Sequence, residues 1–85
     1  MDKKELKNLV EENFDAAIFN GTCEFSDRIP DIEGVTFVAQ SSIAGGLLHV
    51  ELKWKSGYMV LYAKNFTRSQ MVSKFTEFLW MYLNS

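Results

Sequence analysis

Apolar and polar residues alternate along residues 47–55, and this period of two predicts a β-strand with one apolar and one polar face. The apolar positions are Leu48, Val50, Leu52 and Trp54, and the polar positions are His49, Glu51, Lys53 and Lys55. Residues 58–63 are rich in aromatic and β-branched side chains, so we expect them to return as a second strand. The two segments together predict a β-hairpin that turns near residues 55–57.

Two registers fit this hairpin, and they place different side chains on its two faces. A three-residue loop needs a left-handed conformation only at Gly57; it pairs Trp54 with Tyr58 and sends Met59 and Leu61 to the polar face. A two-residue turn at residues 56–57 pairs Trp54 with Met59 and sends Tyr58 to the polar face instead. That turn requires a positive φ at a serine, which serine disfavours. We therefore favour the three-residue loop.

An amphipathic helix is predicted over residues 3–19. Asp2 can cap its start, with Glu5 three residues later, and the pair Asn20-Gly21 provides a stop. Its apolar stripe consists of Leu6, Leu9, Val10, Phe14, Ala17 and Ile18. The spacing of this stripe predicts that one side of the helix is buried.

A second amphipathic helix is predicted after Thr67, which forms a Thr-x-x-Gln capping box with Gln70. Its apolar face consists of Met71, Val72, Phe75, Phe78, Leu79 and Tyr82. At 100° per residue, Trp80 and Met81 fall well to either side of that face. We expect these two side chains to lie off the core.

The remaining segments complete a small α+β domain. The composition of Val35–Ser41 predicts another strand, and the alternation near Glu24 allows a short edge strand. Pro30 lies in a stretch with loop composition. The order is α-β-β-β-α. We expect a single domain over residues 1–85, with two helices packed on one face of a three- or four-stranded antiparallel sheet. The other face is left to solvent or to a partner.

Composition points to an ordinary globular domain, since 47% of the 85 residues are hydrophobic and 24% are charged. A single cysteine, Cys23, excludes an internal disulfide and favours a reducing compartment. No stretch has the length and apolar character of a signal peptide or a membrane span. We therefore expect a cytoplasmic protein with no membrane association.

The two parts of the chain carry opposite charge. Residues 1–34 have nine acidic and four basic residues, whereas residues 35–85 have two acidic and five basic residues. Such a split is most often solvated surface, but it also allows the chain to steer a charged partner.

No motif for catalysis, metal or nucleotide binding stands out. Cys23 and His49 are the only thiol–imidazole combination, and nothing in the sequence adds the orienting group that a catalytic pair needs. The carboxylates of the 24–33 segment are Glu24, Asp27, Asp31 and Glu33, and their spacing is not that of a calcium loop. We expect no cofactor, no metal site and no enzymatic activity.

The order of elements is similar to that of double-stranded-RNA-binding domains. Residues 45–49, Gly-Gly-Leu-Leu-His, partly match the Gly-Pro-x-His loop of that family. Its basic cluster at the start of the last helix is reduced here to the single charge of Arg68. Phosphate neutralisation supplies most of the affinity of such domains, so nucleic-acid binding is the alternative rather than the first choice.

The sequence therefore predicts a protein-binding module, either a small adaptor or an inhibitor. Inhibitors encoded by phages or mobile elements, including the anti-CRISPR type, share its size and charge; this is an analogy at the level of the fold. A protein partner or a homodimer would use exposed aromatic and methionine side chains. The predicted contact residues are Trp80, Met81, Met59, Leu61, Glu24, Asp27, Asp31 and Glu33. A small hydrolase using Cys23 and His49 is the third hypothesis.

Overall fold

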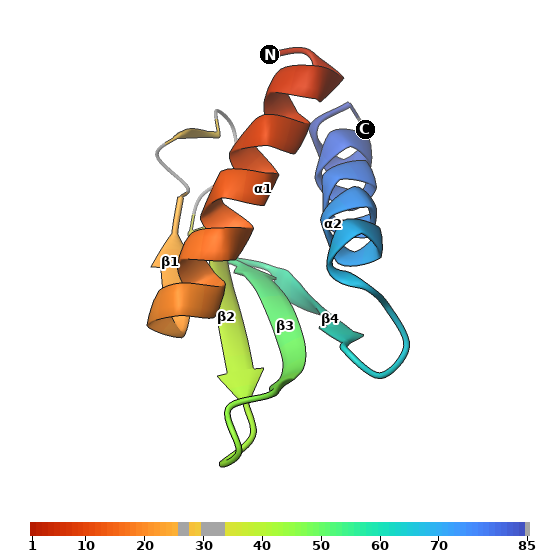
Figure 1. Cartoon of the computed structure of the whole chain (residues 1–85). Helices are drawn as coiled ribbons and strands as arrows, with labels where there is room; N and C mark the ends of the chain where they lie inside the picture. The colour runs from red at the N-terminus through yellow and green to blue at the C-terminus, as the bar shows by residue number, and fades with distance from the viewer. Residues whose placement is uncertain (26–27, 30–33, 85) are drawn as a thin grey trace.

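A computed structural model describes residues 1–25, 28–29 and 34–84 of the chain. Four antiparallel strands form one sheet in the order β1-β2-β3-β4, and two antiparallel helices cover one of its faces (Figure 1). The elements are α1 (Lys3–Asn20), β1 (Thr22–Glu24), β2 (Thr36–Ser41), β3 (Leu47–Trp54), β4 (Gly57–Tyr62) and α2 (Arg68–Leu83). The predicted two-layer α+β fold is confirmed, with the short edge strand present as β1.

The capping residues set the helix boundaries, as predicted. Asp2 Oδ1 accepts a hydrogen bond of 2.8 Å from the Glu5 amide, and Gly21 ends α1 in the left-handed conformation, with φ of 85°. At α2, Thr67 and Gln70 exchange the two hydrogen bonds of a capping box, at 3.2 and 2.9 Å. These contacts satisfy amide groups that a helix start otherwise leaves without partners.

The register of the β3–β4 hairpin differs from both predicted registers, which paired Trp54 with Tyr58 or with Met59. Trp54 pairs with Gly57, and Leu61 pairs with Val50, so the turn consists of residues 55–56 alone. The predicted three-residue loop is wrong, and so is the placement of Met59 and Leu61 on the uncovered face. Both side chains lie on the helix side, where Leu61 is only 6% exposed.

The physical reason for this register lies in the contact between Gly57 and Trp54. A Cβ atom at position 57 would lie 3.0 Å from Cζ2 of the indole ring, so the ring rests directly against the glycine backbone. Gly57 is thus used for close approach across the strands, and it has no left-handed conformation. An aromatic side chain that covers a glycine in this way is a known stabilising device in sheets.

The core centres on Phe37 of β2. Its ring contacts Phe25, Phe14 of α1 and Phe75 of α2, with centroid distances of 5.0, 5.8 and 5.1 Å. One buried ring therefore joins the sheet to both helices. Burial on α2 is rotated slightly from the predicted face, because Thr76 is buried while Phe78 is only half-buried.

Charged contacts join the two helices along their length. Arg68, at the start of α2, donates to Asp15 at 2.9 and 2.5 Å and to Glu11 at 3.3 Å. Lys3, at the start of α1, forms an ion pair with Glu77. The Asp15 hydrogen bonds, together with the charges of Asp15 and Glu11, raise the pKa of Arg68.

Candidate functional site: the uncovered sheet face and the β4 edge

The face of the sheet opposite the helices is organised in cross-strand rows. One row is Thr36–Lys53–Tyr58, the next is Val38–Glu51–Val60, and the third is Gln40–His49–Tyr62. Side chains directly opposite each other on neighbouring strands touch; His49 and Tyr62, for example, have ring centroids 5.5 Å apart. The face therefore presents aromatic, β-branched and charged side chains side by side.

Two tyrosines are the most prominent apolar side chains of this face. Tyr58 is 68% exposed and Tyr62 is 48% exposed, and they flank the half-buried Val60 on β4. Tyrosine combines a large apolar surface with a hydroxyl group, and it is enriched at protein interfaces for that reason.

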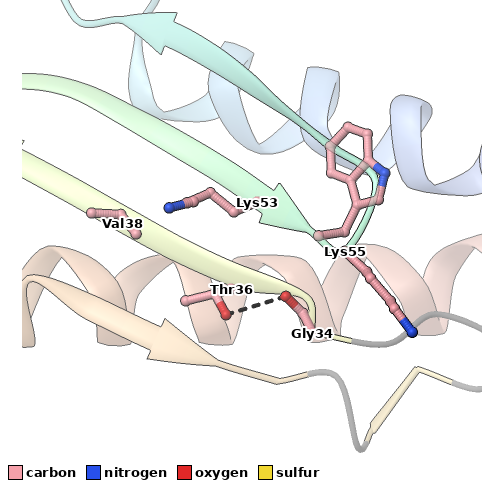
Figure 2. A pocket seen from close by; sticks show the side chains of 6 residues that line it. Gly34, Thr36, Val38, Lys53 and Lys55 are labelled. Carbon is pink, nitrogen blue, oxygen red and sulfur yellow. Dashed lines mark hydrogen bonds between the residues drawn. The ribbon is translucent and has the colours of Figure 1, made fainter.

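A hollow of about 440 Å³ opens at the end of the face where β3 reaches its turn. Gly34, Thr36, Val38 and Lys53 line it, together with Trp54 and Lys55 (Figure 2). The Thr36 hydroxyl donates to the Gly34 carbonyl at 3.4 Å. The hollow can accept an apolar group of a partner, with the cationic side chains of Lys53 and Lys55 in its own lining.

Strand β4 forms one edge of the sheet, and its outer backbone groups can be assigned from the pairing. The Ala63 amide donates to the Leu48 carbonyl at 2.9 Å, and the backbone polar groups of an antiparallel strand alternate in direction. The amides of Tyr58, Val60 and Tyr62 therefore point away from β3. The Tyr62 carbonyl accepts from Asn65 and Phe66 at 3.0 and 3.2 Å.

An apolar groove of about 340 Å³ lies on the helix side of this edge, between β4 and α2. Met59, Phe78 and Met81 supply its apolar lining, and Met81 is 68% exposed. The charged residues at its rim have intramolecular partners: Lys74 Nζ lies 5.1 Å from the centroid of the Phe66 ring, and Glu77 pairs with Lys3.

The structure brings some of the predicted contact residues together at the surface and buries others. Met59 and Met81 come together in the groove, although Met59 reaches it from the helix side of β4 and not from the uncovered face. Leu61 is buried and cannot contact a partner in the folded chain. Trp80 is half-buried and packs against the core, so it is less exposed than the helical pattern suggested.

The predicted acidic residues cannot be placed as a group. Glu24 is exposed on β1, at the opposite edge of the sheet from β4. Asp27, Asp31 and Glu33 lie outside the described residues.

Cys23 and His49 are kept apart by the sheet. The Cys23 thiol lies on the helix side, where its Sγ donates to Asn13 Oδ1 at 3.3 Å. His49 lies on the uncovered face of β3, and β2 separates the two strands. This arrangement does not form a thiol–imidazole pair.

The described residues contain no group of three or more metal-ligating side chains. Neither helix in the described part of the chain is both long and apolar enough to cross a membrane.

The basic residues that would grip a nucleic acid do not converge. Lys53 and Lys55 lie at the end of β3 that enters the hairpin turn, whereas Lys64 follows the far end of β4. A six-residue strand separates these positions by roughly 20 Å. Arg68 is engaged by Asp15 and Glu11 on α1, so its charge is compensated within the molecule.

Sequence reasoning missed the residues that dominate the site, namely Tyr58, Val60 and Tyr62. Their orientation depends on the hairpin register, which was wrongly predicted. One signal was available: residues 56–63 contain no charge, although the structure places them on an edge strand, where charges are common.

Comparisons of the chain with protein-family models, with curated proteins and with solved structures find no match in any of the three.

Proposed function

We propose that the chain is a non-enzymatic protein-binding module that docks its partner on the uncovered face of the sheet. The observation that carries this proposal is the pair of exposed tyrosines on β4, of which Tyr58 lies opposite Lys53 in the lining of the hollow. Large aromatic side chains next to a pocket are the usual centre of a protein interface, while charges at its rim provide specificity.

A protein partner fits this face better than a nucleic acid. The face carries Glu51 in its central row and Glu24 on β1, so its charges are of both signs. Phosphate backbones require a surface of positive charge. The basic residue at the start of α2 is compensated by two carboxylates, which removes the charge that a double-stranded-RNA-binding domain needs there.

Within this proposal the chain acts in the cytoplasm as an adaptor or an inhibitor. An origin in a phage or a mobile element, and action against CRISPR defence, rest only on its small size and its acidic N-terminal part.

The proposal is tested by Val38→Lys, which puts a long charged side chain at the centre of the face. Glu51 lies directly opposite Val38 and can pair with the new lysine, so the fold should tolerate the change. We expect the tagged chain to capture a protein from the lysate of its native host in the presence of nuclease. The variant should lose at least 90% of that capture.

Phe19→Lys is the matched control, because it adds the same charge at a side chain of α1 that is 88% exposed. It should retain full capture. If Val38→Lys and Phe19→Lys capture the same amount of protein, the uncovered face is not the docking surface. If capture disappears with nuclease in the unmodified chain, the nucleic-acid alternative replaces the proposal.

A further inference from the structure

The edge strand β4 lacks the features that normally prevent strands from pairing between molecules. Natural edge strands are shortened, bulged, or protected by charged residues or proline. Strand β1, at the opposite edge, has three residues, whereas β4 has six and contains neither a charge nor a proline. The outward amides of Tyr58, Val60 and Tyr62 are therefore available to another strand.

The sequence of β4 is symmetric about Val60. Residues 58–62 read Tyr-Met-Val-Leu-Tyr. On each side, the central valine is flanked first by an apolar residue and then by a tyrosine. In an antiparallel pair of two such strands centred on Val60, Tyr58 would face Tyr62 of the second copy, and Met59 would face Leu61. Aromatic and β-branched pairs of this kind stabilise neighbouring strands.

We propose that a second copy of this chain pairs with β4 through a two-fold axis at Val60. The two Val60 residues exchange two backbone hydrogen bonds, and each Tyr62 amide donates to the Tyr58 carbonyl of the other copy. The two four-stranded sheets then join into one continuous sheet of eight strands. A self-complementary patch of this type is what a two-fold interface requires.

The groove beside the edge supports the same occupant. It lies on the helix side of β4, so a strand added at this edge would lie next to its lining residues Met59, Phe78 and Met81. The rim charges of Lys74 and Glu77 already have partners within the molecule. Pairing of two copies would therefore cover exposed methionine surface in the seam.

The first test compares Val60→Pro with Val60→Thr by light scattering, with circular dichroism to confirm folding. Proline removes only the Val60 amide hydrogen, which points away from β3, so the sheet within one chain keeps its hydrogen bonds. Threonine retains the amide hydrogen and the β-branched shape. We expect twice the chain mass for the unmodified protein and for Val60→Thr, and the mass of a single chain for Val60→Pro.

The second test reads the register with cysteines in a Cys23→Ser background. Paired Val60 residues would have Cα atoms about 5.5 Å apart, which suits a disulfide. The two Tyr58 residues would be displaced from each other by roughly 13 Å along the strands. Oxidised glutathione should therefore crosslink Val60→Cys into a dimer and leave Tyr58→Cys as single chains.

Three results would overturn the proposal: a single-chain mass for the unmodified protein, a dimer that survives Val60→Pro, or equal crosslinking of the two cysteine variants. If Val60→Pro does not fold, the cysteine variants decide alone. Val38, on which the partner-docking test depends, lies in β2 and not at this edge. Loss of dimerisation with retained capture, or the reverse, therefore separates the two proposals.

Discussion

At the scale of single residues, Gly57 and Trp54 determine which side chains the hairpin exposes. The indole ring lies against the backbone of Gly57 and also contacts Phe78, at a centroid distance of 4.9 Å. The ring is thus held between β4 and α2. A side chain at position 57 would have to displace it.

Gly57→Ala is expected to destabilise the chain by about 1 kcal/mol, because the cost of overpacking exceeds the gain in backbone entropy. The midpoint of urea unfolding measures this change. Gly46→Ala is the control, since its Cβ would make only an ordinary contact of 3.6 Å with Ser42 Oγ. Equal stability of the two variants would show that the indole ring repacks without cost.

Asn13 illustrates a buried polar residue that the helical pattern did not reveal. It lies in the core side of α1, donates to the Leu9 carbonyl at 2.7 Å and accepts from Cys23. Both of its polar atoms are therefore satisfied, as burial requires. The sequence offers no sign of this contact, because Cys23 reaches Asn13 only after β1 has packed on the helix.

At the scale of elements, the helices are held together by charged contacts in addition to the aromatic core. Arg68 bridges Asp15 and Glu11 with three polar contacts of 2.5–3.3 Å. Its side chain is about half exposed, so solvent screens much of the attraction. Because the pKa of Arg68 is raised, its guanidinium keeps its charge until the solution is strongly alkaline, and on the alkaline side the contact is lost only there.

A double-mutant cycle with Arg68→Met and Asp15→Asn should give a coupling energy of about 0.5 kcal/mol. The coupling is expected to shrink when the salt concentration is raised to about 1 M, where the screening length is only a few ångströms. Urea unfolding at both salt concentrations measures it. A coupling that is unchanged by salt would mean that the contact is not electrostatic.

The elements themselves were well predicted because their signals are local. Capping residues, the helical spacing of apolar positions and strict alternation all act within a few residues. The hairpin register was not predictable in this way, since it depends on the packing of Trp54 against Gly57 and α2. The sequence therefore indicated the layers and the uncovered face, but it placed the wrong residues of β4 on that face.

At the scale of the whole molecule, Phe37 is the point where all layers meet. Three other phenylalanine rings surround it, one from each helix and one from the segment after β1. An 85-residue chain has a small core, so this one ring accounts for a large part of the contact between the sheet and the helices.

Phe37→Leu should lower the free energy of unfolding by about 1.5 kcal/mol. For a chain of this size, that corresponds to a fall in melting temperature of about 5–10 °C. Phe19→Leu removes a similar volume from an exposed ring and should change stability by less than about 0.5 kcal/mol. Thermal unfolding at one fixed protein concentration compares them. Similar melting temperatures for the two variants would contradict the central role of Phe37.

The strand order β1-β2-β3-β4 has a consequence for how fast the chain reaches this structure. Every strand pairs with its neighbour in sequence, so each contact of the sheet closes a short loop of chain. Folding rates rise as the mean sequence separation of contacts falls.

The main long-range step is the docking of α2 on α1. It brings Arg68 to Asp15 and Glu11, which lie 53 and 57 positions earlier in the sequence. The sheet can therefore form early, before α2 closes over it, and for that interval the β4 edge and the groove-lining Met59 are exposed to other chains.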